Sequence, residues 1–207
     1  FEEKSRERFL SARELARVGT ALARAERNKT ESVYTLAAIR LLIFTGCRRN
    51  EILGLQWKNV NLEKAMFLLP ETKTVARTVY LSAPAIAVLS SLPRVAKNPF
   101  VIAGDRPGQH LVNLRKPWLR ICKVARLKNV RLHDLRHSFA SVGVSGGASL
   151  PIIGKLLGHA KSATTEKYSH LSADPVRAVN EAMGNQIAAM LHGKRGNIVP
   201  LKFKASD

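Results

Sequence analysis

The sequence has few of the features that mark disulfide-stabilised, zinc-binding or membrane-spanning proteins. Its 207 residues include two cysteines, Cys47 and Cys122, each in an apolar run, and no CxxC pair. Neither a zinc site nor a disulfide framework is indicated, and two buried free thiols are expected, as in a protein of a reducing cytoplasm. The longest apolar stretch, LLIFTGC at 41–47, is far too short to cross a membrane.

Acidic and aromatic residues are also scarce. Asp and Glu number 15 against 34 Lys and Arg, which leaves a formal net charge of +19. Such an excess indicates attraction to a polyanion, and nucleic acid is favoured over an acidic membrane surface because no basic amphipathic helix with a rich apolar face stands out. Aromatic residues make up 6% of the chain, without the aromatic-rich strand that stacks RNA bases, so an RNA-binding module is disfavoured.

The spacing of apolar residues predicts an α+β chain that is mostly helical with one small antiparallel sheet. Ser11 and Glu14 have capping-box spacing at the start of a helix over 11–26, and Gly46 ends a second helix over 31–45. Two short strands are expected within 56–81, on either side of ETKT, and another at 99–104. Ser82 is expected to cap a helix that runs to 89. Further helices are predicted over 48–53, 111–127, 131–144, 149–157 and 175–191.

Two basic motifs carry candidate chemistry. TGCRRNEI places Arg48 just after a glycine-ended helix and Glu51 three residues later on the same face, which in isolation indicates a solvated ion pair. HDLRH places Arg136 one turn after His133, with His137 in the next position. The two histidines could chelate a metal at this spacing, but the guanidinium between them would repel a cation and no acidic third ligand is positioned. No metal is therefore expected, and His137 is expected to pack or cap locally.

A third motif, TTEKYSH at 164–170, surrounds Tyr168 with polar residues, and His159 precedes it in LLGH. Together with the two arginines, this set holds guanidiniums, imidazoles and a phenol without paired carboxylates. Guanidiniums bind phosphate oxygens in pairs and stabilise the charge of a phosphoryl transition state, and a phenol can act as a nucleophile. The set therefore suits chemistry at a phosphodiester, and no Ser/His/Asp pattern, P-loop or acidic metal site competes with it.

The order TGxRxxE, TKT, HxLRH, LGH and TTxxYxH resembles the catalytic domain of the tyrosine recombinase (phage-type integrase) family, from residue 8 to residue 171. The resemblance implies a site-specific recombinase that cuts and rejoins DNA through a 3′-phosphotyrosyl intermediate, with no cofactor, metal or ATP. Glu51 would support the architecture around the first arginine. The implied catalytic residues are Arg48 and Arg136 (phosphate clamp), Lys73 (general acid), His133 (proton acceptor), His159 (phosphoryl hydrogen bond) and Tyr168 (nucleophile). The sequence TKTVART lacks the glycine that often follows the lysine, so the turn that carries Lys73 departs from the family pattern.

The same resemblance implies the partners and the setting. Double-stranded DNA, a homo-oligomer assembled on it (a tetramer) and accessory DNA-bending proteins are expected, in the cytoplasm of a bacterium or encoded by a phage or mobile element, with no membrane. Residues 1–207 are expected to be a single catalytic domain of a longer protein whose N-terminal DNA-clamp domain is absent, with 192–207 as a C-terminal tail. The apolar face of 175–191 and the stretch NIVPLKF (197–203) could pack on their own domain or on a neighbouring protomer. Two other functions stay open, a type IB topoisomerase-like nicking and closing enzyme and a basic DNA-binding module that has lost catalysis.

Overall fold

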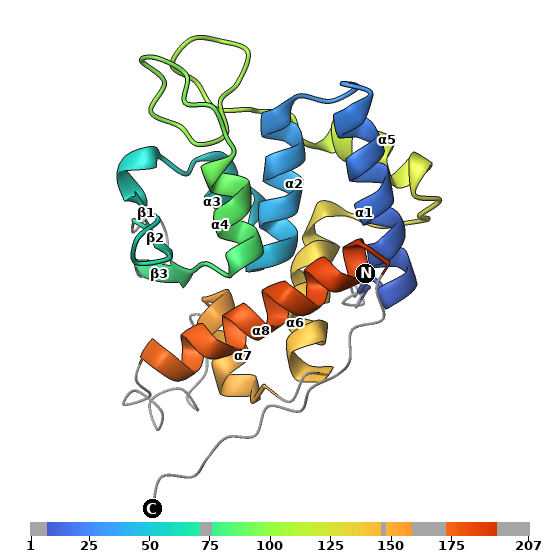
Figure 1. Cartoon of the computed structure of the whole chain (residues 1–207), viewed down its shortest axis with the longest axis vertical. Helices are drawn as coiled ribbons and strands as arrows, with labels where there is room; N and C mark the ends of the chain where they lie inside the picture. Colours follow the sequence, from blue (N-terminus) through green and yellow to red (C-terminus); the bar gives the residue numbers. More distant parts are fainter. Residues whose placement is uncertain (1–7, 71–75, 146–147, 159–172, 194–207) are drawn as a thin grey trace, which may run out of the picture.

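The computed structural model describes residues 8–70, 76–145, 148–158 and 173–193, and in this part the chain is mostly helical with one small antiparallel sheet (Figure 1). This confirms the fold class predicted from the sequence. The helices are α1 (Ala12–Arg27), α2 (Val33–Thr45), α3 (Arg49–Leu53), α4 (Ala83–Ser90), α5 (Arg115–Val124), α6 (Leu132–Ser145), α7 (Leu150–Leu157) and α8 (Ala173–Leu191), with a short 3₁₀ helix at Trp57–Asn59.

Helix α2 lies at the centre of the core. It has apolar residues on every side, and all of its residues from Thr35 to Ile39 and from Leu41 to Thr45 are buried. Helices α1, α4, α6 and α8 pack around it. It ends at Gly46 in the left-handed conformation, as expected, and α1 begins with the predicted capping box of Ser11 and Glu14. Arg48 therefore lies two residues after Gly46, the end of the buried core helix.

The sheet has three strands, β1 (Val60–Asn61), β2 (Met66–Leu69) and β3 (Arg77–Tyr80), in the order β1-β2-β3. Strand β2 pairs with β3 so that Phe67 lies opposite Val79 and Leu69 opposite Arg77. Phe67, Leu69 and Val79 are buried, which places this face of the hairpin against the helices. The first strand was not anticipated, since only two residues form it.

Helix α8 crosses the domain and packs against α1, α2, α4, α6 and α7 (Figure 1). Val179, Met183, Ile187 and Leu191 on its apolar face are buried against the chain's own α1, α2, α4 and α6. Of the two arrangements left open for this helix, the structure therefore has the one in which it packs on its own domain. The stretch 197–203 lies outside the described residues. No helix in the described ranges is both long and apolar enough to span a membrane.

Two local predictions were wrong. Ser82 occupies the N-cap position of α4, but its hydroxyl makes no capping bond and has no partner within the described chain. The carboxylate of Glu181 on α8 instead accepts the backbone N–H of Ala83, at 3.1 and 2.9 Å from its two oxygens. The segment 99–104 forms isolated bridges, Gln56 with Phe100 and Ala103 with His110, and no strand. Both outcomes depend on residues distant in sequence, which a local pattern does not contain.

Candidate active site and nucleic-acid interface

Arg48 is held at the start of α3 by Glu51. Its backbone N–H donates to Glu51 Oε2 at 2.6 Å, and its Nη1 donates to Glu51 Oε1 at 2.9 Å. The arginine side chain remains 41% exposed, whereas that of Glu51 is 18% exposed. The predicted ion pair is thus half-buried, and the carboxylate fixes a guanidinium that solvent, or a ligand, can still reach.

Arg136 comes from α6 and is buried, with 5% of its surface exposed. Its Nη1 donates to the carbonyl of Gly46 and its Nη2 to the carbonyl of Leu157, both at 2.8 Å. Burial lowers the pKa of Arg136 to about 10, and the nearby charge of Arg48 acts in the same direction. These contacts bring together three segments, the residues just before Arg48, one turn of α6 and the end of α7.

His133 lies one turn before Arg136 on α6. Its ring meets that of His137 edge to face, with 4.9 Å between the ring centroids. Burial, His137 and Arg136 lower the pKa of His133 below its ordinary value. The imidazole is therefore neutral at physiological pH and can accept a proton, and His137 packs locally as predicted.

Arg77 is a further charged residue of this region that sequence reasoning missed. Its Nη2 donates to Glu51 Oε2 and its Nη1 to the carbonyl of Leu156, each at 2.9 Å. The available signal was the alternation of β3: Arg77 shares a strand face with buried Val79, and an arginine at an inward position requires a partner.

The region carries an excess of positive charge. Three guanidiniums, of Arg48, Arg77 and Arg136, lie near the single carboxylate of Glu51 within the described part of the chain. Burial alone would raise the pKa of Glu51, but the backbone N–H of Arg48 and the charge of Arg77 outweigh it and leave that pKa below its usual range. An ionised Glu51 offsets one of the three positive charges, so the arrangement favours binding of an anion such as a phosphate.

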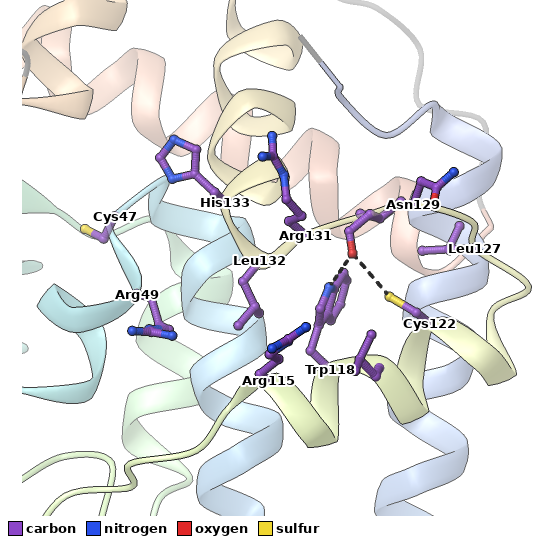
Figure 2. A pocket seen from close by; sticks show the side chains of 12 residues that line it. Cys47, Arg49, Arg115, Trp118, Cys122, Leu127, Asn129, Arg131, Leu132 and His133 are labelled. Carbon is purple, nitrogen blue, oxygen red and sulfur yellow. Dashed lines mark hydrogen bonds between the residues drawn. The ribbon is translucent and has the colours of Figure 1, made fainter. Parts of the chain in front are cut away.

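A groove of about 600 Å³ extends from this region along α5. Figure 2 shows Cys47, Arg49 and His133 on one side of it and Trp118 and Cys122 on the other. Arg49, Arg115 and Arg131 also line it, and Figure 2 labels each of them. The floor is fixed, since Trp118 Nε1 donates to the Val130 carbonyl at 3.0 Å. A groove with basic edges next to this cluster of arginines suits a nucleic-acid backbone.

The structure brings together three of the six residues proposed for catalysis: Arg48, His133 and Arg136. Lys73, His159 and Tyr168 lie outside the described residues. On the N-terminal side of Lys73 the described chain ends at Pro70, and on the C-terminal side it resumes just before β3. It also ends at Gly158, the residue before His159. Both cysteines are free and buried, as predicted, and burial raises the pKa of Cys122 to about 12.

Side chains of the types that bind metals do not gather at one point in the described part of the chain. Across the four described ranges, no group of three or more His, Cys, Asp or Glu side chains is arranged to hold a metal ion. Cys47 and His133 do line the same groove, but arginines accompany them there.

Comparisons with known proteins agree with this geometry. Residues 8–174 match the model of the phage integrase family. The tyrosine recombinase XerC of Pelobacter propionicus is 31% identical over 172 residues, which are 78% of this chain and 57% of that protein. The tyrosine recombinase XerA of Saccharolobus solfataricus is 32% identical over 145 residues, 67% of this chain and 46% of that protein. The chain thus spans roughly half the length of these two relatives.

Solved structures share the fold. A crystal structure of XerA recombinase superposes with a TM-score of 0.63 at 26% identity, covering 82% of this chain and 63% of that one. The XerH site-specific recombinase bound to its difH substrate gives a TM-score of 0.63 at 27% identity, covering 81% and 51%. The integrase from mycobacterium phage Brujita, at 21% identity, has the same fold with a TM-score of 0.68 over 100% of this chain and 63% of that one. The chain therefore belongs to the phage integrase family, and its relatives are tyrosine recombinases.

Proposed function

We propose that this chain is the catalytic domain of a site-specific recombinase that cuts and rejoins DNA strands through a 3′-phosphotyrosyl intermediate. The observation that carries the proposal is the convergence of Arg48, at the start of α3, with His133 and Arg136 on α6, beside a basic groove that His133 lines. Fixed guanidiniums directed at a developing phosphoryl charge are a strong source of catalysis, because they need little reorganisation during the reaction.

In the proposed reaction the phenol oxygen of Tyr168 attacks the scissile phosphorus. His133, neutral because of its lowered pKa, accepts the phenol proton. The bond from phosphorus to the 5′-oxygen breaks, and Lys73 donates a proton to that oxygen. His159 donates a hydrogen bond to a phosphoryl oxygen. The phosphodiester bond is replaced by a phosphotyrosyl bond of similar energy, so a 5′-hydroxyl from a partner strand can reverse the step without ATP.

We further propose that four protomers act on two duplexes, with accessory DNA-bending proteins where the site requires them, in a bacterial, phage-encoded or mobile-element-encoded setting in the cytoplasm. The support is the family and the bound DNA of the related XerH complex. A type IB topoisomerase-like enzyme would use similar residues without exchanging partners, so exchange between two labelled duplexes separates the two functions. A non-catalytic DNA-binding module would form no covalent bond with DNA.

The test is covalent attachment to a nicked duplex that loses its 5′-hydroxyl fragment after cleavage. The parent protein is expected to form an adduct through residue 168, identified by mass spectrometry of the linked peptide. Tyr168→Phe should abolish the adduct and leave DNA binding nearly intact, because only the nucleophilic oxygen is lost. Tyr34→Phe is the matched control, since the Tyr34 hydroxyl donates to the Pro93 carbonyl at 3.0 Å and takes no part in the site. Adduct formation by Tyr168→Phe would refute the assignment.

A further inference from the structure

Arg77 is a partly buried guanidinium that the proposed reaction does not use. Its side chain is 14% exposed, and β3 directs it toward the helices. A cation this far from water is stable only when its N–H groups find acceptors. The identity of these acceptors shows what the residue holds in place.

The acceptors come from the chain around the start of α3 and from the end of α7. Nη2 donates to Glu51 Oε2 on α3 at 2.9 Å, and Nη1 donates to the carbonyl of Leu156 on α7 at 2.9 Å. The longest of these bonds runs from Nη2 to Cys47 Sγ, just before α3, at 3.7 Å. The side chain also packs over Gly158, where a Cβ atom would overlap its Cδ and Nε atoms. Arg77 therefore joins the sheet to α3 and to the last turn of α7.

At α3 the contact acts on Arg48. Glu51 Oε1 accepts Arg48 Nη1, and Oε2 accepts both the backbone N–H of Arg48 and Nη2 of Arg77. A carboxylate fixed from both sides has one usable orientation. Arg77 thereby restricts the carboxylate that aims the Arg48 guanidinium.

At α7 the contact acts on Arg136. Arg77 occupies the Leu156 carbonyl and Arg136 the carbonyl of the next residue, Leu157. A shift of this turn would move the second acceptor of Arg136 and also the point from which the chain leads to His159. One side chain thus connects the supports of both phosphate-binding arginines.

We infer that Arg77 is a positioning residue for Arg48 and Arg136, acting through Glu51 and the C-terminal turn of α7. The inference rests on the proposed function. Because the Arg77 N–H groups named above are directed at protein acceptors, loss of the residue slows cleavage at saturating DNA without weakening DNA binding. An arginine that contacted DNA directly would instead change the affinity and its salt dependence.

The first experiment compares Arg77→Gln with the parent chain by single-turnover adduct formation on the nicked duplex, DNA affinity and thermal melting. The rate is expected to fall by about tenfold to a hundredfold, the effect of misplacing catalytic groups by about 1 Å, while the affinity stays within about twofold. Arg40→Gln is the matched control. Arg40 forms a similar two-bond pair with Glu26, at 3.1 and 2.6 Å, between α2 and α1.

The second experiment separates positioning of the clamp from loss of general stability. A methylphosphonate at the scissile position removes a phosphate charge and with it part of the need for the arginines. The ratio of parent to Arg77→Gln rates is expected to shrink on this substrate. Glu51→Gln combined with Arg77→Gln should cost less than the product of the single effects, because both act on one network.

The results have distinct readings. A parent chain that forms no adduct overturns the proposed function itself. If the parent forms the adduct and Arg77→Gln cleaves as fast as the parent, the positioning role is overturned. The same holds if the Arg77→Gln rate is reduced by the same factor on both substrates. If Arg77→Gln has melted at the assay temperature, Arg77→Lys is used instead. A single ammonium cannot reproduce the planar fork, so an intermediate rate supports the inference and a rate equal to that of the parent refutes it.

Discussion

Gly46 tests how closely the core helix and the site are packed together. It has a φ of +63°, and a Cβ atom there would lie 2.5 Å from Cδ1 of Phe139 and 2.9 Å from Cδ2 of Leu157. Gly46→Ala combines left-handed backbone strain, about 1–2 kcal/mol, with overpacking, about 1–3 kcal/mol. We expect the free energy of unfolding to fall by about 2–5 kcal/mol and the melting temperature by roughly 5–15 °C.

The same substitution should impair catalysis beyond its effect on stability. The Gly46 carbonyl accepts Nη1 of Arg136, and Phe139 lies one turn after that arginine on α6. Displacement of either moves the guanidinium relative to the scissile phosphate. Adduct formation, measured well below the melting temperature of the variant, should slow by on the order of tenfold or more.

Two matched glycines separate the contributions. Gly108 also has a positive φ, +70°, but a Cβ atom added there would meet no atom within 4 Å, so Gly108→Ala should cost only about 1 kcal/mol. Gly154 lies inside α7 with open space around it, so Gly154→Ala should raise stability by about 1 kcal/mol. Urea unfolding of all three variants checks the order. If Gly46→Ala were no less stable than Gly108→Ala, the packing argument would be wrong.

Four further outcomes are expected. The cleavage rate should stay level as the pH falls to about 6.5 and decrease at lower pH, because the lowered pKa keeps His133 neutral. Folding stability should also decline below about pH 6.5, since the unfolded chain binds the proton more readily than the folded one. A cleavage rate that already falls above about pH 7 would contradict this. Arg136→Lys should retain DNA binding but slow adduct formation severely, because one ammonium cannot hold both carbonyls and a phosphate. DNA affinity should drop by orders of magnitude between about 50 and 200 mM salt if six or more phosphates are contacted, and a flat response would exclude such an interface. Deletion of residues 192–207 should reduce assembly on two-site DNA, measured by crosslinking, without lowering the melting temperature, whereas unfolding would show that the tail belongs to the protomer core.

The helix ends could be predicted because their determinants are local. The Ser11 hydroxyl accepts the N–H of Glu14 three residues away, and Gly46 relieves the steric cost of a left-handed helix end. Each feature involves only residues that are close together in the sequence. The same holds for the Arg48–Glu51 pair, whose spacing alone predicts contact on one turn.

The supports of the site could not be predicted in this way. Arg77 reaches Leu156 over a sequence separation of 79 residues, and Arg136 reaches Gly46 over 90. Glu181 replaces Ser82 as the cap of α4 across 98 residues. In each case the partner is chosen by the packing of α7, α2 or α8, which depends on the whole core. The motifs identified Arg48 and Arg136 but not Arg77, and the acceptors that orient Arg77 and Arg136 required the fold.

The choice of carbonyls as partners for Arg136 has a consequence for substrate entry. A carboxylate partner would compete with the phosphate, and its bonds would have to break or rearrange as the substrate arrived. Peptide carbonyls of Gly46 and Leu157 orient the guanidinium but leave its full charge available. The cation is therefore preorganised for an anion before any DNA is present, at the expense of folding stability. Selection at this position would then act on where the two backbone oxygens lie, and so on the glycine and the helix end that present them.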